Sequence, residues 1–174
     1  MQLYVDENKS KDYFFAVTAV PTQRANSARK FLKKLKFPGQ RSIHFVNEKP
    51  ARRNQILDQL VLSDLQVHII RAPGLRDIPA RKACLQGTVA LAESLGANKI
   101  VFELDETLLD FDSKILREEI HLRGLRTSLV FLHLPRDQEP LLWVSDAIAW
   151  SLARGAEFGR KAQRLVRTFE DYPR

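Results

Sequence analysis

Short runs of β-branched and aromatic residues alternate along the chain with stretches in which apolar residues recur every three or four positions. The short runs predict strands and the periodic stretches predict helices. The predicted strands are residues 3–5, 13–20, 42–46, 65–70, 99–104 and 127–134. The predicted helices are residues 22–36, 50–62, 79–95, 112–123 and 140–154, followed by an amphipathic segment at 157–169.

The order of these elements predicts an α/β fold. A short polar turn at 7–12 joins the first two strands and favours an antiparallel hairpin, whereas the later alternation with helices favours parallel crossovers. We therefore expect a mixed sheet of about six strands with helices packed on its faces. No repeat or long linker divides the sequence, so we expect one domain over 1–174, with a core at 2–154 and a C-terminal helix at 157–169.

Charge is distributed unevenly along the 174 residues, whose formal net charge is +7. Residues 1–50 carry ten basic and four acidic groups, whereas residues 101–150 carry five and ten. Phosphates bound around a carboxylate metal site would explain a basic body with an acidic segment, but so would one solvated acidic helix. The sequence shows no signal peptide, no apolar run of membrane-spanning length and a single cysteine, so we expect a cytoplasmic protein that does not contact membranes.

Two acids stand in apolar surroundings. Asp146 is the only charge in residues 141–153 of a predicted helix, and Glu103 follows the apolar run at 100–102 of a predicted strand. An isolated buried carboxylate costs several kcal/mol unless it is paired or coordinated. A metal or catalytic site would satisfy both acids. The alternatives are a salt bridge or a helix-end hydrogen bond for Asp146, and a solvated edge strand for Glu103.

A third candidate acid lies at the end of the first strand. Asp6 and Glu7 precede the predicted hairpin turn, where Asp6 could also form an Asx turn. Two or three carboxylates on adjacent elements can hold Mg²⁺, which prefers oxygen ligands, and a pair of such ions promotes phosphodiester hydrolysis. Asp6, Glu103 and Asp146 are therefore the predicted ligands of Mg²⁺ or Mn²⁺.

Basic residues cluster on the predicted helix at 22–36, and two more lie near the start of the predicted helix at 50–62. They could contact a nucleic-acid backbone or could equally form a solubilising face. The candidate backbone contacts are Arg24, Arg29, Lys30, Lys33, Lys34, Arg52 and Arg53.

A family resemblance rests on four segments in this order. They are Tyr4-Val5-Asp6-Glu7, Ile43-His44-Phe45 with Glu48, Val101-Phe102-Glu103, and Pro140-Leu141-Leu142 with Asp146 and Trp150. Together they resemble the bacterial "domain of unknown function 3800" family over residues 2–154. The resemblance implies a ribonuclease-H-like fold and nuclease-like chemistry in which an acid of the first strand, an acid of a later strand and an Asp of a late helix converge on divalent metal.

Carried onto this chain, the resemblance implicates Asp6, Glu103 and Asp146 as metal ligands. Glu7 follows Asp6 in the Asp-Glu pair, and His44 and Glu48 match the His-containing segment, so these three are expected to support the metal or transfer protons. The predicted basic helix before the third strand departs from the ribonuclease H pattern of three successive antiparallel strands. His44, placed on a predicted strand, could instead be a core histidine.

The sequence therefore predicts a metal-dependent nuclease acting on RNA or DNA. One alternative is a non-enzymatic nucleic-acid-binding or interaction module whose acids are structural. A lesser alternative is a haloacid-dehalogenase-like phosphatase, because residues 100–110 resemble its first motif. In that motif, however, Glu103 replaces the nucleophilic Asp, and the extra methylene would displace the attacking oxygen.

Overall fold

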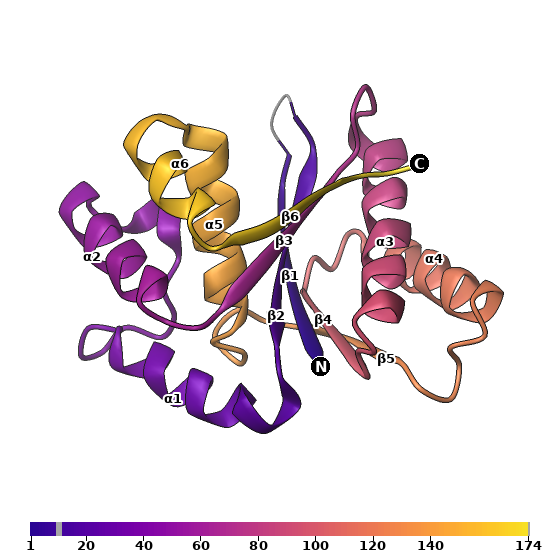
Figure 1. Cartoon of the computed structure of the whole chain (residues 1–174), viewed down its shortest axis with the longest axis horizontal. Coiled ribbons are helices and arrows are strands. Elements are labelled where there is room, and N and C mark those ends of the chain that lie inside the picture. Colours follow the sequence, from indigo (N-terminus) through magenta and orange to yellow (C-terminus); the bar gives the residue numbers. More distant parts are fainter. Residues whose placement is uncertain (10–11, 174) are drawn as a thin grey trace.

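The computed structural model describes residues 1–9 and 12–173, which contain a six-stranded mixed sheet (Figure 1). Its spatial order is β5-β4-β1-β2-β3-β6. The strands are β1 (Gln2–Asn8), β2 (Phe14–Val20), β3 (Gln66–Arg71), β4 (Lys99–Glu103), β5 (Val130–Leu134) and β6 (Val166–Asp171).

The predicted hairpin and crossovers are both confirmed. β1 pairs antiparallel with β2 and β2 antiparallel with β3, whereas β1–β4, β4–β5 and β3–β6 are parallel pairs. Residues 10 and 11 of the predicted turn lie outside the described residues. β4 has a hydrogen-bonded neighbour on each side, so the alternative that placed Glu103 on an edge strand is wrong.

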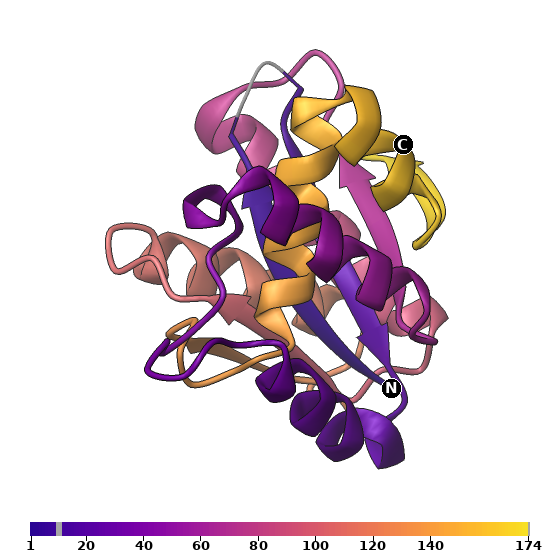
Figure 2. The ribbon, with the colours of Figure 1, turned by 90° about the vertical axis from the view of Figure 1, so that its left-hand side faces the viewer.

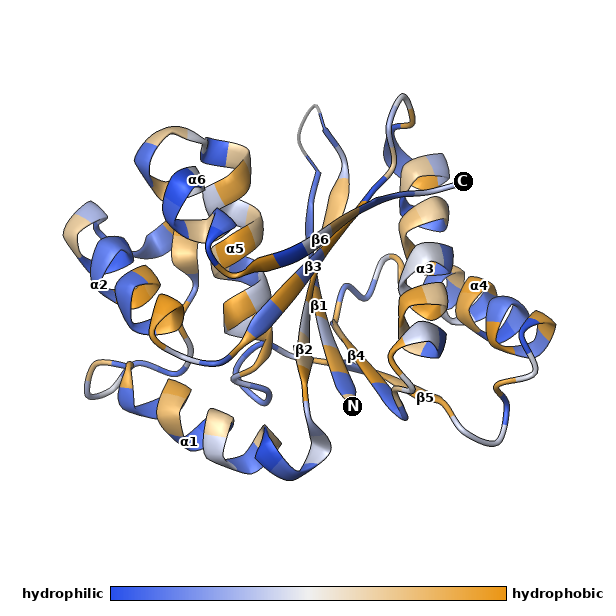
Figure 3. Ribbon diagram, in the orientation of Figure 1, coloured by the Kyte–Doolittle hydropathy of each residue, from blue (hydrophilic) through white to orange (hydrophobic). Residues whose placement is uncertain are grey.

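Helices cover both faces of the sheet, as Figures 1 and 2 show. α1 (Ala25–Lys34), α2 (Pro50–Val61), α5 (Leu142–Arg154) and α6 (Ala156–Gln163) pack on one face around a core that includes Tyr4 and Trp143. α3 (Asp77–Ser94) and α4 (Leu109–Leu122) pack on the other face, around a core that includes Leu3 and Val5. In Figure 3 β2, β4, β5 and α5 are mainly apolar, whereas β6, α1 and α4 mix apolar and polar residues.

Two predicted elements are wrong. Residues 42–46 form no strand: they are an irregular segment that enters a 3₁₀ turn, Phe45–Asn47, in which the buried Phe45 ring packs against Trp150 at 5.4 Å. The predicted helix at 157–169 contains α6 and then β6, because the alternating sequence after residue 165 pairs with β3. The sheet therefore reaches six strands through β6 rather than through residues 42–46.

The remaining predicted elements match observed ones with shifted ends. Residues 22–36 contain a 3₁₀ turn, Thr22–Arg24, followed by α1. The connection between β2 and β3 contains both α1 and α2. Despite its length, β2 and β3 are neighbours in the sheet, so β1, β2 and β3 form a continuous antiparallel run. Within the described residues no helix combines the length and apolar character that crossing a membrane requires.

Candidate functional site

The register of two parallel strands brings the first pair of acids together. β1 and β4 are neighbours, and Val5 lies opposite Phe102. The next residue on each strand is an acid, Asp6 on β1 and Glu103 on β4. Both side chains therefore emerge side by side at the C-terminal end of these strands, which is where sites form in open α/β sheets.

Helix α5 brings the third acid. A buried hydroxyl fixes this helix on the sheet, because Ser145 Oγ donates to the Tyr4 carbonyl oxygen at 2.8 Å and lies 2.7 Å from Thr18 Oγ1. The next residue, Asp146, is only 7% exposed, and its Oδ2 accepts a 2.8 Å hydrogen bond from the backbone N–H of Phe45. The helix and the 3₁₀ turn together hold this carboxylate beside β1.

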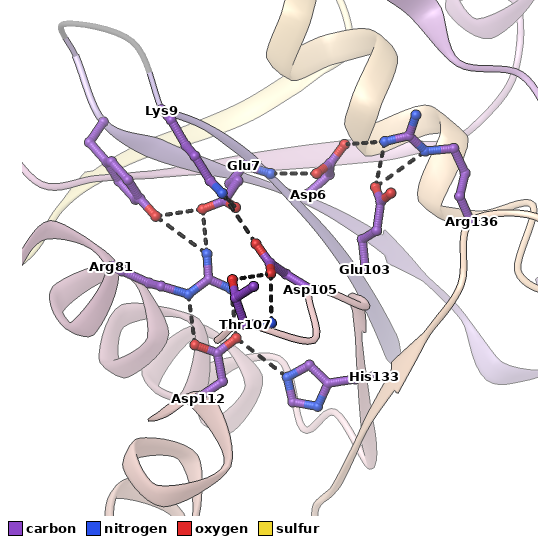
Figure 4. Close-up of polar contacts among 11 residues, drawn as sticks. Asp6, Glu7, Lys9, Arg81, Glu103, Asp105, Thr107, Asp112, His133 and Arg136 are labelled. Atoms are coloured by element: carbon purple, nitrogen blue, oxygen red, sulfur yellow. Dashed lines mark hydrogen bonds and ion pairs between the residues drawn. The ribbon is translucent and has the colours of Figure 1, made fainter. Parts of the chain in front are cut away.

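One guanidinium lies among the three carboxylates. Arg136, in the loop between β5 and α5, donates to Glu103 Oε2 from Nη2 at 2.7 Å and from Nε at 3.3 Å. Its Nη2 lies 3.9 Å from Asp6 Oδ2, and its Nη1 lies 3.7 Å from Asp146 Oδ2. The contacts to Asp6 and Glu103 are drawn in Figure 4. Asp6 Oδ2 and Glu103 Oε2 are at most 6.6 Å apart, since they lie 3.9 and 2.7 Å from the same atom, Arg136 Nη2.

Burial and crowding of like charge both disturb these acids. Burial raises the pKa of Asp6 well above its usual value, and the charges of Asp146 and Glu103 raise it further. Burial also raises the pKa of Asp146, although Arg136, the Phe45 N–H and His44 act in the opposite direction. One cation does not balance three carboxylates, so the cluster favours additional positive charge.

The cluster lies where two open cavities meet. One has a volume of about 490 Å³ and is lined by Asp6, Glu103 and Arg136 together with Lys9 and Arg81, among others. The second has a volume of about 540 Å³, shares Glu103 and Arg136 with the first, and is otherwise lined by Gln40, Arg41, Ser42, His44 and Asn47. Asp6 and Glu103 are therefore accessible from a groove that also carries cationic side chains, whereas the buried Asp146 lines neither cavity.

The donor chemistry of the cluster fits a divalent cation. Its three carboxylates supply the oxygen ligands that Mg²⁺ prefers. Across residues 1–9 and 12–173, however, no three His, Cys, Asp or Glu side chains are placed to ligate one ion as they stand. The Arg136 guanidinium occupies the space between the carboxylates of Asp6, Glu103 and Asp146.

Glu7 belongs to a separate cluster on the opposite face of β1, centred on Arg81 of α3 (Figure 4). Arg81 binds Asp112 of α4 through two hydrogen bonds, at 2.7 and 2.6 Å, and also pairs with Glu7. Tyr13 donates a hydrogen bond to Glu7, and Lys9 lies 3.0 Å from it. The Glu7 side chain thus has partners away from Asp6, although its backbone N–H donates to Asp6 Oδ1 at 2.8 Å.

The structure places His44 near the acids and Glu48 apart from them. The prediction that placed His44 on a strand is wrong. His44 lies directly before the 3₁₀ turn, where it lines the second cavity. The Glu48 carboxylate accepts a 2.6 Å hydrogen bond from Gln40 Nε2 and does not line either cavity. Glu48 therefore holds the irregular segment together. Asp105 Oδ1 accepts hydrogen bonds from the Thr107 N–H and hydroxyl and so caps the turn after β4.

The predicted backbone-contact residues fall into two groups. Lys30, Lys33 and Lys34 are exposed on α1. The four arginines have partners within the chain: Arg24 pairs with Asp64, Arg29 with Glu139, Arg52 with the Leu35 carbonyl, and Arg53 with the carbonyls of Phe45 and Val46.

Three charged residues of these clusters were missed by the sequence reasoning in these roles: Arg136, Arg81 and Asp112. Arg136 stands in a polar loop that resembles any solvated turn, and Arg81 and Asp112 lie on helices among other charged residues. The one available signal was indirect: three acids predicted to converge require a cation from somewhere in the chain.

Comparison with known proteins finds similarity in structure only. No family model and no curated protein matches the sequence. The chain is similar to one in the structure of the PCNA:RNase HII complex from Archaeoglobus fulgidus, with a TM-score of 0.57 and 14% sequence identity, over 95% of this chain and 75% of that one. At this identity the likeness concerns the fold. The chain therefore has an α/β, ribonuclease-H-like fold.

Proposed function

We propose that this protein is a divalent-metal-dependent nuclease that hydrolyses phosphodiester bonds of RNA or DNA. The observation that carries the proposal is the convergence of carboxylates from β1, β4 and α5 around Arg136, where Asp6 and Glu103 line the open groove. The structural likeness to a chain of the PCNA:RNase HII complex supports it at the level of the fold. Membership of the "domain of unknown function 3800" family is part of the same proposal.

In this proposal Asp6, Glu103 and Asp146 hold Mg²⁺ or Mn²⁺. A bound divalent cation supplies Lewis-acid chemistry, neutralising charge on the phosphodiester and lowering the pKa of water. The Phe45 N–H and the Glu7 N–H each donate to one oxygen of Asp146 and Asp6, respectively, and so orient these carboxylates. Oriented ligands lose less freedom when they bind.

The other groove residues receive supporting roles. His44 is the proposed proton donor to the leaving oxygen, because it lines the groove beside Arg136 and lies close enough to Asp146 to affect its pKa. Glu7 supports Asp6 through the backbone, and Glu48 supports the segment that carries His44 through Gln40.

Nucleic acid is the proposed partner. Arg41 in the groove and the exposed Lys30, Lys33 and Lys34 of α1 offer positive charge to phosphates. Four arginines are proposed as secondary phosphate contacts, because each already has a partner within the chain. They are Arg24, Arg29, Arg52 and Arg53.

A cleavage assay tests the function. Purified protein should cut at least one of single-stranded RNA, single-stranded DNA, duplex DNA and an RNA–DNA hybrid in Mg²⁺ or Mn²⁺, and EDTA should abolish cutting. Asp146→Asn should lower the rate by at least about 100-fold, since losing even an outer-shell partner of a metal costs about 10- to 100-fold. Asp64→Asn, which alters an exposed acid paired with Arg24, is the matched control and should cut normally. Full metal-dependent activity in Asp146→Asn would refute the assignment.

The second candidate is a nucleic-acid-binding module without catalysis. The observation that favours it is the position of Arg136, which pairs with all three acids and so gives them a structural role. Stability separates the two candidates. Asp146→Asn in EDTA should be neutral or stabilising if the acids form a crowded metal site, whereas breaking a structural buried pair should cost about 3–5 kcal/mol.

A further inference from the structure

The side chain of Arg136 occupies the point on which the three acids converge. Its guanidinium contacts Asp6, Glu103 and Asp146 at 2.7 to 3.9 Å, whereas Mg²⁺ binds its oxygen ligands at about 2.0–2.1 Å. An ion that used these carboxylates would draw them inward into the space that the guanidinium fills. The two cations cannot share that space, because like charges a few ångströms apart in a partly buried site repel strongly.

A hydrogen bond within the chain fixes the backbone of Arg136, whereas its side chain is held by the acids. Trp143 Nε1 donates a 2.8 Å hydrogen bond to the Arg136 carbonyl oxygen, which ties the loop to the first turn of α5. Among residues 1–9 and 12–173, the hydrogen bonds and ion pairs of the guanidinium are all with the three acids. A change of side-chain rotamer, without refolding of the loop, is therefore sufficient to vacate the centre.

The groove offers the displaced guanidinium a place to go. Arg136 lines both cavities, so a new rotamer can project into either one. A polyanion bound in the groove would place phosphate oxygens there, and the planar guanidinium binds phosphate through two parallel hydrogen bonds.

We propose that Arg136 is a resident counter-ion of the acid centre, which a divalent cation must displace and which then binds a phosphate of the substrate. The proposal rests on the proposed function for the metal and adds the regulation of its binding. Without metal, Arg136 stabilises the three carboxylates. With metal, it changes partner from carboxylate to phosphate, so metal occupancy and substrate binding are coupled through one side chain.

Binding of Mn²⁺ alone tests this proposal without an activity measurement. Calorimetric titration of the full chain should give an affinity for Mn²⁺ that is about tenfold or more higher in Arg136→Gln than in the wild type, because the competing charge is gone. Arg136→Lys, which keeps the charge, should bind Mn²⁺ much as the wild type does. Arg71→Gln, which removes an exposed arginine paired with Asp171 outside the groove, is the control and should not change the affinity.

Thermal unfolding provides the second measurement. In EDTA, Arg136→Gln should melt below the wild type, because three carboxylates lose their cation, and millimolar Mn²⁺ should close the difference. If Arg136→Gln binds Mn²⁺ no more tightly than the wild type, the counter-ion proposal is wrong while the nuclease proposal stands. If neither protein binds Mn²⁺, both proposals are wrong.

Discussion

Two arginine-centred clusters flank β1, and they begin at consecutive residues. Asp6 points to the face covered by α5 and meets Arg136, whereas Glu7 points to the face covered by α3 and meets Arg81. Both clusters contain carboxylates from distant parts of the chain. Figure 4 shows them on either side of the strand.

The clusters differ in how well charge is balanced. Arg81 binds Asp112 with two short hydrogen bonds, and Arg81 and Lys9 together face Glu7 and Asp112. Burial acts to raise the pKa of Asp112, yet the hydrogen bonds from Arg81 and the nearby His133, 3.4 Å away, hold it below its usual value. Around Arg136 the pKa values of Asp6 and Asp146 are raised instead. A balanced cluster stabilises the fold, whereas an excess of carboxylate charge marks a place prepared for another cation.

The largest expected effect is the loss of the balanced cluster. Arg81 is 4% exposed, so Arg81→Gln leaves the buried Asp112 without its arginine and the partly buried Glu7 with Lys9 alone. We expect a loss of about 3–5 kcal/mol in the free energy of unfolding, measured by urea denaturation at neutral pH. Arg136→Gln should cost less, because Asp6 and Asp146 already have raised pKa values and take up protons more readily. Equal losses in the two variants would remove the distinction between the clusters.

The second prediction concerns pH and has opposite signs in the two clusters. The folded-state pKa of Asp112 is lowered, so its contribution to stability is present above the unfolded value of about 3.9 and is lost as the pH falls through the folded value. Asp112→Asn should therefore be less stable than the wild type at pH 7, with a difference that shrinks below about pH 4.

Asp6 should behave in the opposite way. Its raised pKa means that stability is lost as the pH rises above the unfolded value, so Asp6→Asn in EDTA should be neutral or stabilising at pH 7. Urea denaturation at pH 7, 4 and 3 measures both variants, with Asp64→Asn as the control for an exposed carboxylate. A difference between Asp112→Asn and the wild type that does not depend on pH would contradict the balanced-cluster interpretation.

Two of the three acids of the proposed site stood out in the sequence because each breaks a local pattern. Asp146 interrupts an apolar helix and Glu103 ends an apolar strand, and a charge in such a place requires a partner. Their arginine could not be predicted in the same way. Arg136 lies 33 residues from Glu103 in sequence and far from Asp6, and its loop is polar and unremarkable, so only the assembled fold reveals the contact.

The fold was predicted where local pattern and tertiary context agree. β1 to β4 follow from apolar runs that the sheet buries in large part, and β5 follows from an apolar run that stays partly exposed at the edge of the sheet. Residues 42–46 are similarly apolar but form no strand. The Phe45 ring packs on Trp150, and the Phe45 N–H donates to Asp146 rather than to a neighbouring strand. β6 was predicted as helix because the sequence after α6 continues an amphipathic pattern. The segment forms a strand because it pairs with the open edge of β3.

The smallest expected effect concerns Lys9, the exposed member of the balanced cluster. Its side chain is 57% exposed and contacts Glu7 at 3.0 Å and Asp105 at 3.3 Å. Lys9→Gln should lower the free energy of unfolding by less than about 1 kcal/mol, because a flexible charge in water gains little from an ion pair. In 1 M NaCl this difference should nearly vanish, whereas the difference caused by Arg81→Gln should persist, since salt screens exposed pairs far more than buried ones. A loss in Lys9→Gln as large as that in Arg81→Gln would mean that the cluster depends on its total charge rather than on the buried geometry around Arg81.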